Sequence, residues 1–177
     1  MRNNLQTMMV LTAFVMGIGI IHSCKKKEQT TDTAADTDKE LYEMAKVTSG
    51  FTWFKNSSTV LSRSAGSGHQ QLFLKTRYNM IAATKLDSTG KIMSGATFPE
   101  GSLIVKELFG DSTTLERYAI LYKNASSADA DDKGWVWGYI NADGSVAESA
   151  TKKGISCISC HSQTDNIDYM LMNKYFP

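Results

Sequence analysis

The segment GWVWGYINADG, residues 134–144, combines strict alternation of side chains with a tight turn. One side of an extended chain would carry Trp135, Trp137 and Tyr139, while Val and Ile fall on the other side. A period of two is that of a β-strand. The closing Asn-Ala-Asp-Gly is typical of the turn that ends such a strand. We therefore predict a strand here, with the aromatic side in the core.

The same alternation recurs in residues 71–78 and 115–123, and residues 102–109 contain the apolar run Leu103-Ile104-Val105 between turns rich in Gly, Pro, Asp and Ser. The further strand candidates are residues 71–78, 102–109 and 115–123. Helical spacing is found only at the edges of the domain, in residues 39–47, 82–86 and 165–174. Short strands separated by turns favour an antiparallel sheet. The predicted fold is mainly β (α+β): an antiparallel sheet with a few short helices.

Residues 157–161 read CISCH, and a Cys-x-x-Cys-His run is typical of covalent c-type haem attachment. Two thiols three positions apart reach the two vinyl groups of one porphyrin. Cys157 and Cys160 are therefore predicted to hold one haem c, and His161 to bind its iron through a neutral imidazole nitrogen. A thioredoxin-like motif or half of a zinc site are the alternatives. The first needs a βαβ context and the second needs another ligand pair, which the sequence does not supply.

The N-terminus has the form of an export signal. A short positive start is followed by an apolar run over residues 5–21, and Cys24 follows Ile-His-Ser. These residues resemble a bacterial lipobox, so we predict a lipoprotein signal peptide over residues 1–23 and acylation of Cys24. The alternative is a plain transmembrane anchor, since about seventeen apolar residues is near the lower limit for spanning a bilayer. Either interpretation places the domain outside the cytoplasm, in the bacterial cell envelope.

Residues 24–39 are predicted to form a flexible tether, because Lys, Gln, Thr, Asp and Ala dominate them. The haem domain is then residues 40–177, a single domain large enough for a core. The net charge of the 177-residue chain is +1, which suggests no polyanionic partner and no nucleic acid. The partner hypotheses are a small diatomic or nitrogen-oxide ligand, a redox protein, the membrane and a second copy of the chain.

Several motifs together resemble those of the cytochrome P-460 family. FPEGSLIVKE, residues 98–107, is similar to the aromatic-x-acidic-Gly turn and Val-Lys-Glu strand of that family. GWVW, residues 134–137, resembles its Gly-Gly-Trp strand, and CISCH followed by Asp168-Tyr169 resembles its terminal haem segment. The resemblance spans residues 53–176. It implies a β-sheet protein with one five-coordinate haem, related to the cytochromes c-prime-beta.

The resemblance also implies roles for two basic residues. In cross-linked members a lysine bonds to the porphyrin edge, and Lys106 matches its position; a distal-side arginine falls near Arg77. The alternative for each residue is a strand side chain in an ion pair. Hydroxylamine-oxidising members carry a distal carboxylate where this sequence has Ala119. Oxidation of hydroxylamine needs a base near the bound nitrogen, and only Glu116 or Glu107 could substitute from nearby positions.

No residue is predicted to fill the sixth iron position. His69, in a Gly/Ser loop, is interpreted as a solvated or locally hydrogen-bonded residue, and Met170 and Met172 follow His161 too closely to reach the opposite haem face. Met80 and Met93 are interpreted as core or loop residues. We expect an open or water-occupied site lined by apolar and aromatic side chains. The hypotheses are a five-coordinate haem protein that binds nitric oxide or a similar ligand, an electron relay, or a hydroxylamine-oxidising enzyme with Lys106 cross-linked.

Overall fold

The structure of the protein is a computed structural model that describes residues 34–177. The predictions for the signal peptide, Cys24 and most of the tether lie outside these residues. Within residues 34–177, no helix has the length and apolar character needed to cross a bilayer.

One antiparallel sheet organises the described residues, in the order β1-β3-β4-β5-β6-β7, with β2 also paired to β3. The four long strands are β3 (Phe73–Tyr78), β4 (Leu103–Phe109), β5 (Leu115–Lys123) and β6 (Trp135–Asn141). Each corresponds to a strand predicted from the sequence, which confirms the predicted fold class. Short strands that the sequence did not indicate complete the edges: β1 (Thr52–Trp53), β2 (Leu61–Ser62) and β7 (Val146–Glu148).

The helices are short and lie around this sheet. They are α1 (Ala34–Lys46), α2 (Met80–Ala83), α3 (Ile155–His161) and α4 (Met172–Tyr175), together with the 3₁₀ helices η1 (Phe54–Asn56) and η2 (Ala150–Lys152). Helix α1 begins within the predicted tether. The Asn79 side chain accepts a hydrogen bond from the Ala82 backbone N–H and so caps α2.

The predicted helix over residues 165–174 is wrong for most of its length. Asp165, Asp168 and Tyr169 have φ values of 68°, 47° and 72°, which no right-handed helix accommodates. Only α4 at its end is helical. Met170 and Met172 are nevertheless buried in the core, as the sequence pattern indicated.

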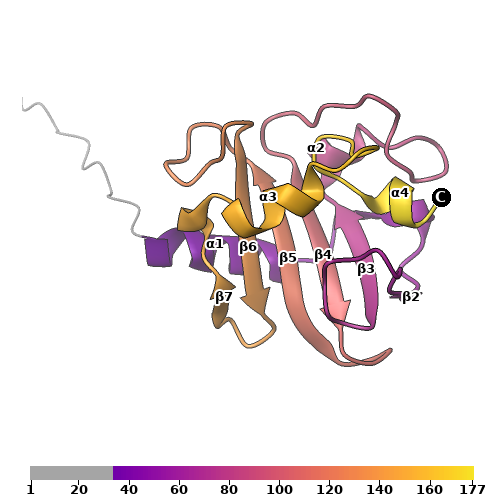
Figure 1. Ribbon diagram of the computed structural model, residues 1–177, viewed down its shortest axis with the longest axis horizontal. Coiled ribbons are helices and arrows are strands. Elements are labelled where there is room, and N and C mark those ends of the chain that lie inside the picture. The colour runs from indigo at the N-terminus through magenta and orange to yellow at the C-terminus, as the bar shows by residue number, and fades with distance from the viewer. Residues whose placement is uncertain (1–33) are drawn as a thin grey trace, which may run out of the picture. The chain divides into compact units, whose positions relative to one another are not determined.

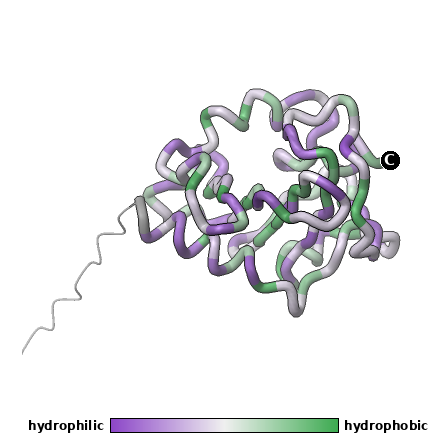
Figure 2. The backbone as a smooth tube through the Cα atoms, turned by 90° about the horizontal axis from the view of Figure 1, so that it is seen from below, coloured by the Kyte–Doolittle hydropathy of each residue, from purple (hydrophilic) through white to green (hydrophobic). Residues whose placement is uncertain are grey.

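Both faces of the sheet are covered, so the long strands are buried on both sides. One face, here called the pocket face, carries Trp135 and Trp137 of β6 and is covered by α3 and the C-terminal segment. The opposite face, the α1 face, carries Val136 and Ile140 and is covered by α1. Figure 1 shows α3 in front of the strands and α1 behind them. In Figure 2, α1 alternates between hydrophilic and hydrophobic colours, as expected for a helix with one buried side.

Candidate haem site

Helix α3 carries the CISCH motif across the pocket face. It starts at Gly154, whose φ is 68° and where a Cβ would lie only 2.6 Å from the Trp137 ring. Glycine therefore lets the helix rest directly on the indole. Cys157 and Cys160, three positions apart, are half-buried free thiols. Residues at this spacing lie on one side of a helix, so both thiols are presented to the same cavity.

The His161 ring is held by two contacts. Its Nδ1 lies 2.7 Å from the carbonyl oxygen of Tyr169, so Nδ1–H donates and Nε2 keeps a free lone pair. Its ring meets Trp137 edge to face, with centroids 5.3 Å apart. Burial, and next the positive charge of Lys106, lower the pKa of His161 to about 4. The imidazole is therefore neutral at pH 7, the form that binds a metal.

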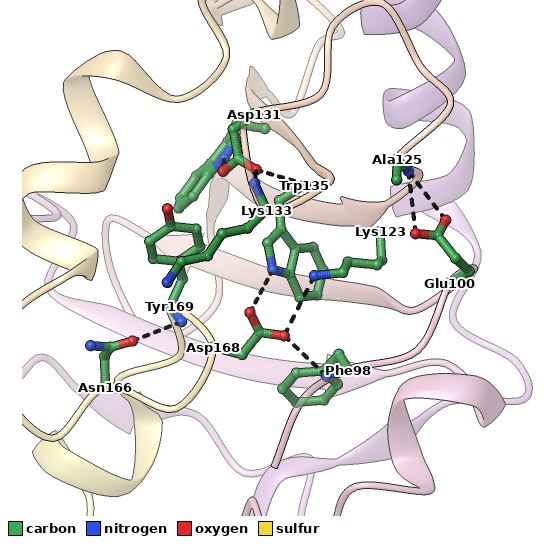
Figure 3. Close-up of polar contacts among 11 residues, drawn as sticks. Phe98, Glu100, Lys123, Ala125, Asp131, Lys133, Trp135, Asn166, Asp168 and Tyr169 are labelled. Carbon is green, nitrogen blue, oxygen red and sulfur yellow. Dashed lines mark hydrogen bonds and ion pairs between the residues drawn. The ribbon is translucent and has the colours of Figure 1, made fainter. Parts of the chain in front are cut away.

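The segment that supplies the Tyr169 carbonyl is anchored by Asp168, as Figure 3 shows. The Asp168 carboxylate accepts hydrogen bonds from the Trp135 indole N–H at 3.1 Å and the Phe98 backbone N–H at 3.0 Å. Lys123 lies 3.7 Å from the same group. Asn166 accepts from the Tyr169 backbone N–H at 3.0 Å. These contacts hold the left-handed backbone at Asp168 and Tyr169 in place next to His161.

A cavity of about 410 Å³ opens beside these residues. Its walls come from β4, β5, β6, α3 and the loop before β3, and include Lys106, Ala119, Trp137, Tyr139, Cys157 and His161. The volume falls in the range of cofactor pockets. Both thiols and a neutral imidazole converge on this single cavity, so the residues present fit a covalently held haem.

Lys106 lines this cavity, as a cross-linking role would require. It is half-buried, and burial lowers its pKa to about 8. Its cross-strand neighbour is Ala119, which in turn pairs with Tyr139. The structure thus brings Lys106, Ala119, Cys157, Cys160 and His161 together.

Arg77 does not belong to this group. It lies fully buried on the α1 face, where its guanidinium pairs with Glu107 and donates a hydrogen bond to the Ala45 carbonyl in α1. Lys75 also pairs with Glu107, at 3.1 Å. Arg77 therefore takes the ion-pair alternative, and neither it nor Glu107 lines the cavity. Neighbouring positions of a strand face opposite sides of the sheet. This alternation places Arg77 and Lys106 on opposite faces.

The other suggested base, Glu116, is also outside the cavity lining and accepts a hydrogen bond from Gln71 at 3.3 Å. The cavity wall does hold polar groups that were not predicted from the sequence: Arg117 on β5, Tyr139 on β6 and Glu148 at the end of β7. The period of two could have placed Arg117 and Tyr139 beside Ala119. Glu148 had no such signal.

The His69 side chain is neither solvated nor hydrogen-bonded within its own loop, contrary to the prediction, because it contacts Tyr139 of β6. Its half-buried ring lines the same cavity, 6.3 Å from the His161 ring centroid to centroid. Its Nδ1 lies 3.4 Å from the Tyr139 hydroxyl. Burial, followed by the nearby charge of Lys106, lowers the pKa of His69 far below its usual value. The cavity is therefore less apolar than the sequence analysis expected.

A pocket on a β-sheet, with a Cys-x-x-Cys-His helix packed over it, defines this protein as a β-rich cytochrome. Comparison with protein families then identifies the group: the chain belongs to the cytochrome P460 family, whose model matches residues 49–172. The match runs from just after α1 to the start of α4, so it includes the whole sheet and the CISCH helix. Membership implies that the chain binds haem. No curated protein matches the sequence in a direct comparison.

Proposed function

We propose that this chain is an exported mono-haem c-type cytochrome that binds a small ligand, nitric oxide or a similar molecule, or transfers electrons. The observation that carries the proposal is the convergence of Cys157, Cys160 and the free Nε2 of His161 on one cavity. Haem bound there would supply an iron centre able to take up an electron and a ligand.

Each residue has a distinct task in this proposal. Cys157 and Cys160 would hold the haem covalently through their Sγ atoms. His161 would bind the iron through Nε2, while the Tyr169 carbonyl keeps the proton on Nδ1. Trp137 limits rotation of the imidazole, and its own N–H donates to Asp131 at 2.8 Å. Together these residues would fix the orientation of the one iron ligand that His161 supplies.

Covalent attachment is tested by denaturing gel electrophoresis with a haem-peroxidase stain, on protein matured in a host with c-type attachment machinery. The wild-type chain should stain, and Cys157→Ala or Cys160→Ala should weaken the stain. His161→Ala should leave thioether formation possible but remove normal ligation. An unstained wild-type chain contradicts the proposal.

The second candidate is an oxidoreductase that oxidises hydroxylamine or a related nitrogen compound, with Lys106 bonded to the porphyrin. The observation that favours it is the position of Lys106 in the cavity wall, with a pKa low enough to leave part of the amines unprotonated near neutral pH. Ala119 in place of a proton acceptor weighs against it. A far-red-shifted Soret band of the ferrous protein would indicate the cross-link; an ordinary c-haem spectrum would exclude it.

A further inference from the structure

Two histidines, rather than one, face the cavity that would hold the haem. His161 comes from helix α3. His69 is distant from it in the sequence and comes from the loop between β2 and β3. Both rings are half-buried, and their centroids are 6.3 Å apart. Two imidazoles on opposite sides of one metal ion, each bonded at about 2.1 Å, have ring centres roughly 6 Å apart. The spacing of these two rings therefore fits one iron between them.

The hydrogen bonds of His69 leave the nitrogen that a metal needs. The Tyr139 hydroxyl donates to Gln71 Oε1 at 3.4 Å, so its oxygen accepts the Nδ1–H of His69 at 3.4 Å. That assignment places the lone pair of His69 on Nε2. The same reasoning applies to His161, where Nδ1–H is taken by the Tyr169 carbonyl at 2.7 Å. Both rings thus present an unprotonated Nε2, the usual arrangement of a metal-binding histidine.

The spacing of residues along β6 explains the distance between the His69 and His161 rings. His161 lies against Trp137, and His69 lies against Tyr139, with ring centroids 5.3 and 5.7 Å apart. Trp137 and Tyr139 are two positions apart on β6, which separates them by about 6.8 Å along the pocket face. Ala119 pairs with Tyr139 across the sheet. Its short side chain leaves space in the wall between the two histidines.

The loop that bears His69 is held against the haem-attachment segment. A Cβ on Gly68 would lie 3.6 Å from Cys160 Sγ, and one on Gly66 would overlap the Tyr175 ring. The Arg63 guanidinium donates to the His69 carbonyl at 3.1 Å. The backbone next to His69 therefore lies close to a thiol that would bond to the haem.

We propose that His69 is the second axial ligand of the haem iron, opposite His161, and that an external ligand binds by displacing it. The inference rests on the proposed function, because it requires the haem in this cavity. It replaces the open sixth position expected from the sequence with one that the protein itself fills in the absence of ligand. Ligand uptake would then be gated by release of the His69 side chain.

The test uses the purified holoprotein and its absorption and electron paramagnetic resonance spectra in the ferric state. Wild-type protein should be low-spin, with two nitrogen ligands. His69→Ala should be high-spin, and added imidazole should return it to low-spin. Gln70→Ala is the matched control, because Gln70 is the exposed neighbour in the same loop. It should keep the wild-type spectrum.

Carbon monoxide binding to the ferrous protein supplies a second readout. In the wild type the rate should level off at high carbon monoxide concentration, where release of His69 limits it. In His69→Ala the rate should rise linearly and exceed the wild-type plateau at least tenfold. If His69→Ala loses its haem, His69→Met replaces it: a low-spin form with a higher reduction potential supports ligation at this position.

A high-spin wild-type spectrum that His69→Ala leaves unchanged would overturn the axial role of His69 while leaving the proposed function intact. Loss of the proposed function has a different result. In that case the wild-type chain carries no covalent haem.

Discussion

Arg77 and Lys106 show how one strand position decides a residue's role. In the pairing of β3 with β4, Arg77 faces Val105 and Thr76 faces Lys106. Side chains alternate between the two faces, so Arg77 lies under α1 and Lys106 lies in the cavity wall. The family resemblance assigned both basic residues to the haem site. In the structure, Arg77 forms an ion pair, whereas Lys106 is a site residue.

Arg77→Met should lower the free energy of unfolding without changing the haem spectrum. The substitution leaves the buried Glu107 carboxylate with only Lys75 as a partner, and breaking a buried pair costs about 3–5 kcal/mol. Because Lys75 compensates in part, we expect the lower end of that range, measured by urea unfolding. Arg117→Met is the control from the pocket face, and it should alter the spectrum more than the stability. A spectral change in Arg77→Met would return Arg77 to the haem site.

Lys106 should make stability rise with pH. The folded protein releases the Lys106 proton near pH 8, whereas the unfolded chain holds it to about 10.5. Between these values the unfolded state binds more protons, so the free energy of unfolding increases with pH, and the full burial cost remains below pH 8. Lys106→Met should remove that increase and should raise the free energy of unfolding by about 1–3 kcal/mol at pH 7. Denaturant unfolding of the wild type and Lys106→Met from pH 7 to 10.5 measures this difference. If the free energies of unfolding of the two proteins change with pH in parallel, the prediction is wrong. A Lys106 cross-linked to the haem would also contradict it.

Ala119→Glu should raise hydroxylamine oxidation from a low baseline. The new carboxylate would stand in the cavity wall beside Lys106, its cross-strand neighbour, and could accept a proton from the bound substrate. General bases typically contribute a factor of about a hundred to ten thousand. Steady-state assays with a chemical electron acceptor compare it with Ala119→Gln, which has similar size but no base. Robust turnover by the wild type would show that a different residue takes the proton.

At the scale of elements, the four long strands could be predicted from local patterns: β3, β5 and β6 alternate over six or more residues, and β4 contains a Leu-Ile-Val run between two turns. Their register then places Trp135, Trp137 and Tyr139 on the pocket face, as the pattern of β6 indicated. The C-terminal segment could not be predicted in the same way. Its apolar spacing is helical, but the left-handed backbone at Asp168 and Tyr169 depends on hydrogen bonds to Trp135 and Phe98 that are distant in sequence.

In the candidate site, too, only the residues in a local sequence motif could be predicted. The CISCH motif is local, so three residues of the site could be identified from the sequence alone. His69 is brought to the cavity by a loop whose position depends on contacts with Cys160 and Tyr175, and no local pattern marks it. The faces of Arg77 and Glu107 follow only from the register of β3 and β4. Long-range placement, rather than residue type, is what could not be predicted.

The segment between α3 and α4 should tune the haem through Asp168. Asp168→Asn removes the charge that faces Lys123 and weakens the hydrogen bonds that hold the Tyr169 carbonyl under His161. A weaker bond at Nδ1 makes His161 a poorer donor to ferric iron, so the reduction potential should rise. Stability should fall by about 1–3 kcal/mol. Asp165→Asn is the matched control, since Asp165 has the same left-handed backbone but is exposed; an equal change in both variants would exclude a specific role for Asp168.

At the scale of the whole molecule, the proposed location of the protein depends on Cys24, which precedes the described residues. A single acyl chain gives only reversible membrane binding, since each buried methylene contributes about 0.8 kcal/mol, and stable anchoring needs more than one chain. A lipidated Cys24 would provide such an anchor and hold the haem domain at the membrane surface. Cys24→Ser should leave unprocessed precursor or release the domain. Haem-stained fractions of membrane and soluble protein measure it, with Ser23→Ala, which keeps a small residue before the cysteine, as control. Wild-type protein found entirely in the soluble fraction would contradict the anchor.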